Sequence, residues 1–314
     1  MCGIVGGIGV KKPDYKKIIA SISHRGPDSN GFFSKDNFFM CHTRLSIQDV
    51  SSKANQPMFS NDKRYVIVFN GEIYNHNDIR KSLDYDFKSS GDTETVLASF
   101  IKYGPSFLKL LNGIFSLAIF DSKKNELFFA RDHLGVKPLY IYKDSEKFLF
   151  SSEIKSFLNF DIDKKIDFSA LVNYLTFLWS PGNKTPFEKV KKITPGSYAI
   201  IKLDNYENIE FKKYYTLKFD GKYFHKSEDE LIDILDTKLQ KAVKRQMLSD
   251  VPIGFFLSGG LDSSLIVAIA KKINPKLNLE CFTIDDNNFK EGFVKDIYYA
   301  KKVAKYLNVN LNVI

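Results

Sequence analysis

The second residue of the chain is a cysteine, which stands in the stretch MCGIVGGIGV. Cysteine is small enough for the initiator methionine to be removed, which would leave a thiol and a free α-amine on one residue. An α-amine has a pKa of about 7.7–8.0, so near neutral pH it can accept the thiol proton and leave a nucleophilic thiolate. Taken alone, Cys2 is more simply the start of a buried strand. The polar motifs elsewhere in the chain favour a nucleophile.

Four polar motifs accompany this cysteine: HRGPD at 24–28, HTRLSI at 42–47, NGEIYN at 70–75 and SGDTE at 90–94. A thiolate that attacks an amide needs donors for the oxyanion, which the Asn70 side chain and the Gly71 backbone N–H can supply. An amino-acid substrate also needs a cation for its carboxylate and anions for its ammonium group. Arg44 suits the first need, and Glu72 and Asp92 suit the second. Each residue has an ordinary structural explanation, but the whole set predicts an amide-hydrolysing site.

A glycine-rich motif, FFLSGGLDSS at 255–264, lies between a predicted strand and a predicted helix. Free backbone N–H groups and the dipole of a helix start bind anions, and glycines let the backbone approach a phosphate closely. The hydroxyls of Ser258, Ser263 and Ser264 add donors. The motif lacks GK[ST], so it is not a Walker A loop. Asp262 cannot bind phosphate directly, so we expect it to act through Mg²⁺ or as a structural cap.

The elements that must position these motifs change in character near residue 216. Before it, we expect strands at 1–10, 64–74, 114–121, 126–132, 147–153 and 197–203, with helices at 16–23, 93–104 and 170–179. Many short strands with few helices predict a layered α+β domain.

After residue 216, strands and helices alternate, which predicts a parallel α/β sheet. The expected strands are 251–257, 279–284 and 309–314, and the expected helices are 229–248, 261–273 and 294–307. A capping box of Ser227 and Glu230 opens the first of these helices. We therefore predict one domain over 1–216, a linker over 217–226 and a second domain over 227–314.

Composition excludes several classes of protein. A chain of 314 residues with 44% hydrophobic residues suits two domains with real cores. Its three cysteines are too far apart for a disulfide framework or a zinc site, so we expect a reducing, cytoplasmic setting with Cys41 and Cys281 as buried, inert thiols. Trp179 and the many phenylalanines are expected in the cores. No stretch has the length of a membrane span, and the net charge of +9 is spread along the chain, so neither a membrane nor a nucleic acid is expected as a partner.

The motif set resembles the class II, N-terminal-nucleophile glutamine amidotransferases, and within them the glutamine-hydrolysing asparagine synthetases. The stretches LNGIFSLAIFD, ARDHLGVKPLY, FSSEIKSFL and TPGS are similar to that branch, so the resemblance covers nearly the whole chain. It implies an αββα N-terminal-nucleophile hydrolase domain followed by an α/β pyrophosphatase-loop ATP-binding domain. The glutaminase residues that it implies are Cys2 as nucleophile with its own amine as base, Asn70 and Gly71 as the oxyanion hole, and Arg44, Glu72, Asp92 and Arg25 around glutamine.

The resemblance also implies a second half-reaction, in which ammonia from glutamine meets the side-chain carboxylate of aspartate activated by ATP, and asparagine forms. ATP and Mg²⁺ are the implied cofactors, and the small-molecule substrates are glutamine, ATP and aspartate or another carboxylate. No metal site built from protein ligands alone is expected. The implied ATP-binding residues are Leu257, Ser258, Gly259, Gly260, Leu261, Asp262, Ser263, Thr283 and Ile284.

Several alternatives stay open. Members of this family continue well past the pyrophosphatase loop into the acceptor pocket, so we expect the second domain of this chain to be incomplete and the acceptor to be undetermined. A related amidotransferase that acts on another carboxylate, such as that of a surface-polysaccharide sugar, is one alternative. A fragment that only hydrolyses glutamine is another, and a non-catalytic remnant that binds nucleic acid is a third. The resemblance also suggests a homodimer.

Overall fold

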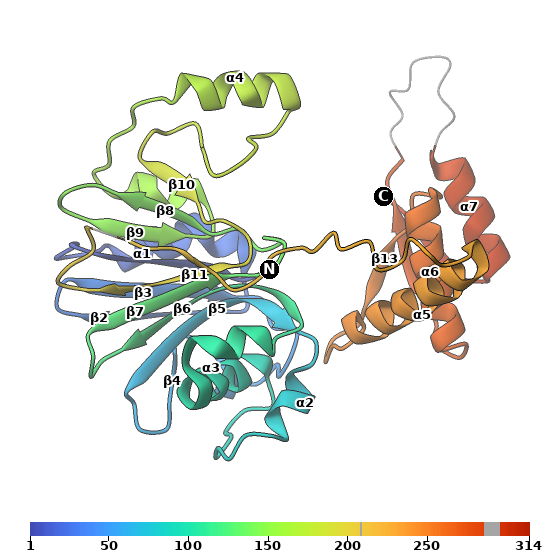
Figure 1. Ribbon diagram of the computed structural model, residues 1–314, viewed down its shortest axis with the longest axis horizontal. Helices are drawn as coiled ribbons and strands as arrows, with labels where there is room; N and C mark the ends of the chain where they lie inside the picture. Colours follow the sequence, from blue (N-terminus) through green and yellow to red (C-terminus); the bar gives the residue numbers. More distant parts are fainter. Residues whose placement is uncertain (208, 286–295) are drawn as a thin grey trace. The chain divides into compact units, whose positions relative to one another are not determined.

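The computed structural model describes residues 1–207, 209–285 and 296–314. The chain forms two compact units, Met1–Lys218 and Phe219–Ile314, and each has its own hydrophobic core (Figure 1). The domain limits expected from the sequence, 1–216 and 227–314, stay predictions. Within the described ranges, no helix combines the length and the apolar character that a membrane span requires.

The first unit is built on two six-stranded antiparallel sheets. The first sheet has the order β10 (Val190–Lys192), β8 (Tyr140–Lys143), β9 (Phe148–Ser151), β1 (Gly3–Ile8), β3 (Phe38–Arg44) and β2 (Ser29–Lys35). The second has the order β12 (Lys212–Lys213), β11 (Ser197–Lys202), β7 (Glu126–Arg131), β6 (Gly113–Asp121), β5 (Tyr65–Ile73) and β4 (Met58–Phe59).

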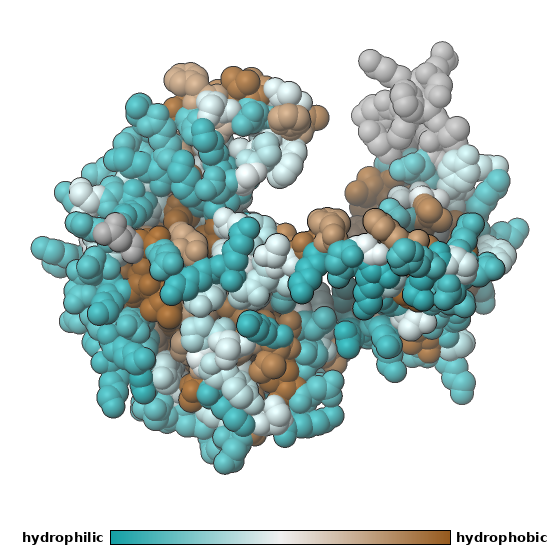
Figure 2. All heavy atoms as spheres, viewed as in Figure 1, coloured by the Kyte–Doolittle hydropathy of each residue, from teal (hydrophilic) through white to brown (hydrophobic). Residues whose placement is uncertain are grey.

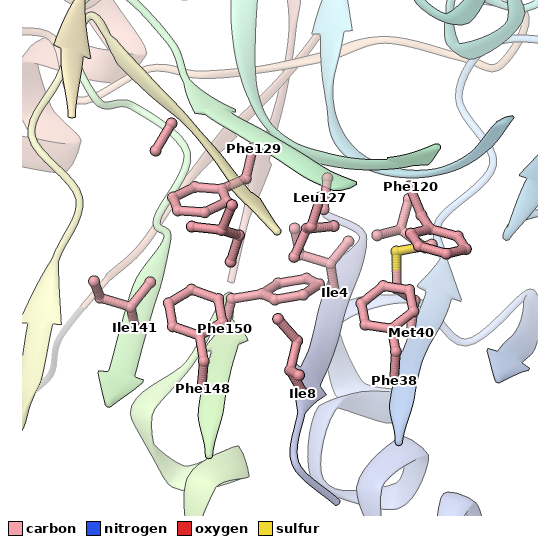
Figure 3. Packing of buried hydrophobic residues seen from close by; sticks show 14 of the residues in the cluster. Ile4, Ile8, Phe38, Met40, Phe120, Leu127, Phe129, Ile141, Phe148 and Phe150 are labelled. Carbon is pink, nitrogen blue, oxygen red and sulfur yellow. The ribbon is translucent and has the colours of Figure 1, made fainter. Parts of the chain in front are cut away.

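Alternating side chains of the two sheets fill the space between them. Ile4 and Ile8 of β1 enter this core beside Phe148 and Phe150 of β9 (Figure 3). The opposite sheet contributes Phe120, Leu127 and Phe129. Successive side chains of a strand point to opposite faces, so a slip of one residue would turn both isoleucines out of the core. The core therefore fixes the register of β1, and with it the position of the residue that precedes β1.

Helices cover the outer faces of both sheets (Figure 1). Ile18 and Ile22 of α1 (Tyr15–Ile22) pack with Val5 on the outer face of the first sheet. Val96 and Leu97 of α3 (Asp92–Tyr103) pack on the second sheet, where α2 (His76–Arg80) also lies. Short 3₁₀ helices span Ser23–Arg25, Ser52–Ala54, Gly104–Lys109 and Ile154–Asn159. The layer order is αββα, and it confirms the fold class predicted for this part of the chain.

The helix α4 (Phe168–Phe177) carries an exposed apolar surface (Figure 2). Only Ala170 of this helix is buried. The helix ends where Leu178 adopts a left-handed backbone with a φ of 57°. Trp179 therefore lies in the following loop, and it is 58% exposed. The expectation that this tryptophan belongs to a core is wrong, because it follows a helix that itself buries only Ala170.

The second unit contains a three-stranded parallel sheet in the order β13 (Gly254–Phe256), β14 (Glu280–Thr283) and β15 (Asn310–Val313). Its helices are α5 (Glu228–Gln246), α6 (Leu261–Ile273) and α7 (Asp296–Leu307). This alternation confirms the predicted parallel α/β arrangement, although 294 and 295 of the last predicted helix lie outside the described residues. The strand expected at 251–257 is shorter than predicted, since Pro252 has no N–H for a ladder.

The predicted capping box of α5 is confirmed. The Glu230 N–H donates to Ser227 Oγ at 3.3 Å, and the Ser227 N–H donates to Glu230 Oε2 at 2.9 Å. Two N–H groups that the helix start would leave unpaired are thereby satisfied.

We predict that Phe150→Ala lowers the free energy of unfolding of the first unit by about 3–5 kcal/mol, because it empties a fully buried position between the sheets. Urea denaturation followed by circular dichroism measures the change. The control is Phe168→Ala, at a side chain that is 74% exposed, with an expected effect within about 0.5 kcal/mol. Equal effects of the two substitutions would contradict the assigned core.

Candidate active site

Cys2 lies directly before β1, which is paired on one edge with β3 and on the other with β9. The Leu45 N–H donates to Cys2 Sγ at 3.4 Å, and the thiol donates to the Leu45 carbonyl at 3.7 Å. Arg25 Nε donates to the Cys2 carbonyl at 2.9 Å. The cysteine is therefore held through both its thiol and its backbone, although it is almost at the chain end.

The environment moves the pKa values of the thiol and of the terminal amine in opposite directions. Burial raises the pKa of the Cys2 thiol, while the Leu45 N–H and the terminal ammonium oppose this rise. Burial lowers the pKa of the Met1 amine, and the positive charges of Lys137 and Arg25 lower it further against the pull of the thiolate. These pKa shifts describe the chain with Met1 in place, whereas the base expected from the sequence is the Cys2 amine, which is free only after Met1 is removed.

Two carboxyl groups stand close together beside the cysteine. Glu72 lies near the end of β5 and Asp92 is the first residue of α3. The Ile73 N–H donates to Asp92 Oδ2 at 2.8 Å, which ties the start of α3 to the end of β5. Burial, and then the charge of Asp92, raises the pKa of Glu72 to about 7, and burial raises the pKa of Asp92 to about 6. A cation placed between these acids would stabilise both of their ionised forms.

Asn70 and Gly71 lie in β5, immediately before Glu72. The Asn70 side chain is fully buried, and neither of its polar atoms has a hydrogen-bond partner among the described residues. Buried amides are normally paired, so an unpaired one is suited to a ligand. A Cβ at Gly71 would lie 2.4 Å from the Ile114 carbonyl oxygen, so no larger residue fits this strand without a backbone shift.

The structure brings most of the predicted glutaminase residues around one cavity: Cys2, Arg44, Gly71, Glu72 and Asp92. Asn70 and Arg25 lie outside its lining. The cavity has a volume of about 30 Å³, which is room for only a few water molecules. An amino-acid ligand therefore needs some side chains of the wall to move.

Arg44 stands at the end of β3 and is buried. Its terminal nitrogens donate to the carbonyl oxygens of Ser51 at 2.7 Å, Gln48 at 3.3 Å and Asp49, and to Asn55 Oδ1 at 2.8 Å. The arginine thus organises the loop 45–55. Bidentate hydrogen bonding of Arg44 to a substrate carboxylate would have to replace two of these hydrogen bonds. This role of Arg44 stays a prediction.

Behind the cysteine lies an ion cluster that the sequence interpretation missed. Arg25 Nη1 donates to Glu153 Oε1 at 2.9 Å, and Glu153 also pairs with His24 at 2.8 Å and Lys155 at 3.3 Å. Burial would raise the pKa of Glu153, but hydrogen bonds from Arg25, His24 and Lys155 outweigh it and lower the pKa to about 2. In the sequence, this glutamate belongs to the stretch FSSEIKSFL, which was noted for its similarity to a known family and not for any role of the glutamate.

Two further polar residues at the site were also missed. Gln48 lines the cavity and directly follows the motif HTRLSI, so its place in the sequence was the available signal. Lys137 is buried, and its charge acts on Glu72 and Cys2. It lies in ARDHLGVKPLY, a loop held by Asp132, whose carboxylate accepts the N–H groups of residues 115, 134, 136 and 137.

In the second unit, the glycine-rich loop joins the carboxyl end of β13 to α6. Gly259 has a φ of 81°, and a Cβ there would lie 2.4 Å from the Ala300 N. Ser258 Oγ lies 3.0 Å from Ser263 Oγ and accepts the Gly260 N–H at 3.3 Å. Ser264 Oγ is buried without a hydrogen-bond partner among the described residues. A tight turn with hydroxyls at a helix start suits a phosphate group.

The remaining predicted ATP-binding residues differ in exposure. Leu257 is fully buried, so it offers a ligand only its backbone, and its N–H already donates to the Phe282 carbonyl at 2.8 Å. Thr283 is buried at the carboxyl end of β14, while Leu261 and Ile284 are exposed. Asp262 lies in the first turn of α6, whose N-cap is Gly260 with no side-chain cap bond, so the expected capping role of Asp262 is not seen in its hydrogen bonds.

The other two cysteines, Cys41 and Cys281, are free and buried, as expected. Burial raises the pKa of Cys41 to about 12, which leaves it protonated and unreactive at neutral pH. No group of three or more potential metal ligands occurs in the parts of the chain that the structure describes.

Comparison with protein families matches both units. Residues 1–215 match the model described as a glutamine amidotransferase domain, and residues 235–314 match the model described as asparagine synthase. The chain is 36% identical to asparagine synthetase [glutamine-hydrolyzing] 1 of Bacillus subtilis, over 98% of this chain and 49% of that protein. It is 35% identical to a putative asparagine synthetase [glutamine-hydrolyzing] 2 of Methanocaldococcus jannaschii, over 98% of this chain and 63% of that protein. The chain thus spans about half to two thirds of these relatives.

Among solved structures, the glutamine phosphoribosylpyrophosphate amidotransferase of B. subtilis matches with a TM-score of 0.51 at 15% identity. The match covers 99% of this chain and 65% of that one. At this identity the likeness concerns the fold alone.

We predict that Glu72→Gln raises the stability of the free protein by about 1–3 kcal/mol at pH 8. The pKa of Glu72 is raised in the fold to about 7, so the folded state holds a proton that the unfolded state releases, and stability falls as pH rises from about 4.5 to 7. The gain should therefore be present above pH 7 and disappear near pH 4.5.

Thermal unfolding of both proteins across this pH range measures the difference. The matched control is Glu146→Gln, at an exposed glutamate, for which no such pH-dependent gain is expected. A constant difference between wild type and Glu72→Gln at all pH values would contradict the assigned titration.

Proposed function

Because this chain belongs to the family of glutamine amidotransferase domains, we propose that its first unit hydrolyses the side-chain amide of glutamine to glutamate and ammonia. The observation that carries the proposal is the cavity that Cys2 lines together with Glu72 and Asp92. A thiol nucleophile beside two acids suits an amide substrate that carries an ammonium group. The free thiol also favours a reducing compartment, so we propose the cytoplasm as its location.

In the proposed reaction, Met1 is first removed, and the freed amine of Cys2 accepts the thiol proton. The thiolate attacks the amide carbon, so a C–S bond forms, and the C–N bond breaks as the nitrogen leaves with that proton as ammonia. Water then attacks the thioester, which releases glutamate and restores the thiol. The Asn70 amide and the Gly71 N–H are the proposed oxyanion donors, since Asn70 has no partner within the described protein.

The two ends of glutamine have separate proposed contacts. Glu72 and Asp92 receive the ammonium group, because both line the cavity with Cys2 and burial raises their pKa values, so a cation there would stabilise their ionised forms. The charge of Arg44 attracts the α-carboxylate, and Arg25 holds the backbone of the nucleophile through its bond to the Cys2 carbonyl. Affinity for glutamine should rise as the pH passes 7, where Glu72 becomes ionised.

For the second unit we propose ATP binding and activation of a carboxylate, with aspartate as the acceptor and asparagine as the product. The match of residues 235–314 to asparagine synthase supports this assignment. The loop fits a phosphate group, because Ser264 Oγ is buried and unpaired in the described structure. The backbone of 258–261 and the hydroxyls of Ser258 and Ser263 would hold the phosphates, Asp262 would act through Mg²⁺, and Thr283 and Ile284 would lie beside the adenine. ATP supplies the leaving group that makes a carboxylate reactive toward ammonia.

We predict that Cys2→Ala abolishes glutamate release from glutamine, whereas Cys41→Ala retains it, since the second thiol is buried and protonated. Glutamate is measured enzymatically, and an intact mass confirms loss of the methionine from the wild type. Glutamate release by Cys2→Ala at the wild-type rate would refute the assigned nucleophile.

We predict that Asn70→Ala lowers kcat for glutamine about 100- to 1000-fold with little change in KM, because the lost donor serves the oxyanion and not the bound amide. Steady-state kinetics measure both constants. A change confined to KM would contradict a role of Asn70 in stabilising the transition state and would indicate a role in substrate binding.

The acceptor is tested by release of AMP from ATP in the presence of glutamine and a series of carboxylates. Aspartate should stimulate AMP release and yield asparagine. Stimulation by a different carboxylate alone would replace aspartate as the proposed acceptor and leave the glutaminase proposal intact.

A further inference from the structure

Gln48 lines the same cavity as Cys2. Its Nε2 donates to Glu72 Oε2 at 2.5 Å. Its Oε1 is buried and has no hydrogen-bond partner among the described residues. A buried acceptor without a donor costs free energy, so this oxygen points to a missing donor at the site.

The orientation of this carboxamide follows from its neighbours. Glu72 in its ionised form only accepts hydrogen bonds, so the NH₂ group of Gln48 must face it and the oxygen must point elsewhere. The backbone is fixed as well, because Arg44 Nη2 donates to the Gln48 carbonyl at 3.3 Å and the next residue, Asp49, accepts the Ser90 N–H at 2.7 Å. These bonds hold the loop between the end of β3 and the start of α3.

An ammonium group has three N–H donors and no acceptor. The proposed site offers carboxylates from Glu72 and Asp92, and a third acceptor is needed to satisfy the group when water is excluded. Gln48 lines this cavity, its Oε1 is an acceptor without a partner among the described residues, and its side chain is hydrogen-bonded to Glu72.

We propose that Gln48 Oε1 is the third acceptor for the α-ammonium group of the substrate, so that Gln48 selects amides that carry this group. The inference rests on the proposed glutaminase function and extends it to substrate selection. In this arrangement one carboxamide has two tasks: its NH₂ orients Glu72 and its oxygen binds the ligand.

The competing explanation is steric. The cavity holds only a few water molecules, so Gln48 could simply occupy space that a ligand needs. The two explanations predict opposite results when the side chain is replaced by leucine, which has a similar size and no polar atoms. A lost acceptor weakens binding only of ligands with an ammonium group, whereas a removed obstacle strengthens binding of every ligand.

The test compares glutamine with 4-carbamoylbutanoate, which is glutamine without its α-amino group. Dissociation constants are measured by calorimetry on the Cys2→Ala protein, which binds without turnover, with and without Gln48→Leu. We expect Gln48→Leu to weaken glutamine binding about 10- to 100-fold, the effect of losing one hydrogen bond to a charged group, and to leave binding of 4-carbamoylbutanoate unchanged.

Kinetics on the protein with Cys2 intact provide the second readout, in which KM for glutamine should rise while kcat stays within about twofold, since the contact is present in ground and transition states alike. The matched control is Ile47→Val, which alters the wall of the same cavity without touching an acceptor and should change the two ligands in parallel.

Equal losses for both ligands, or tighter binding of both, would overturn the role of Gln48. The proposed function fails separately: if the wild type binds glutamine with the expected dependence on Gln48 but releases no glutamate, the binding role stands and the reaction does not. Absence of glutamine binding by the Cys2→Ala protein would overturn both.

Discussion

The position of Cys2, the proposed nucleophile, depends on the pairing of β1 on both of its edges. Chain ends normally fray, but Gly3–Ile8 is an inner strand between β3 and β9. A Cβ at Gly6 would lie 2.3 Å from the Phe150 ring, so only glycine lets the strands and the core close at this point. Because Ile4 and Ile8 fix the register, the thiol of Cys2 always emerges at the same end of the sheets. The fold thus supplies the rigidity that a terminal residue lacks.

The cavity beside this thiol is arranged for a ligand at some cost to the free protein. Glu72 and Asp92 repel each other when both are ionised, and Gln48 and Asn70 keep polar atoms that have no partner in the described parts of the chain. Natural cores rarely contain such groups, since each costs stability. Their position near one cysteine agrees with the proposed ligand, which carries both an ammonium group and an amide. Replacing one of these polar groups should therefore raise the free energy of unfolding of the free protein and lower its activity.

Local signals in the sequence predicted much of this architecture. The strands β5, β6 and β7, the helix α3 and the capping box of α5 follow from hydrophobic pattern and end signals, which act over a few residues. The strand β3 was missed because its last three residues, 42–44, are polar and belong to a motif interpreted as a site, although the whole strand is buried. Local sequence patterns could not predict contacts between residues that are far apart in the chain. Glu153 contacts Arg25, which is 128 residues away, and the loop after β3 brings Gln48 to Glu72.

Arg44 illustrates how residue type and actual partners differ. The sequence predicted a cation at this site, and the structure places one there, yet its bonds go to the loop 45–55. One of the accepting oxygens belongs to Gln48, whose side chain meets Glu72 at the proposed ammonium site. A substrate carboxylate that accepts a hydrogen bond from Arg44 therefore competes for this donor with the carbonyl oxygen of Gln48, the residue proposed to bind the ammonium group. Both ends of an amino-acid ligand would then act on the same loop, so this loop couples the two proposed contacts.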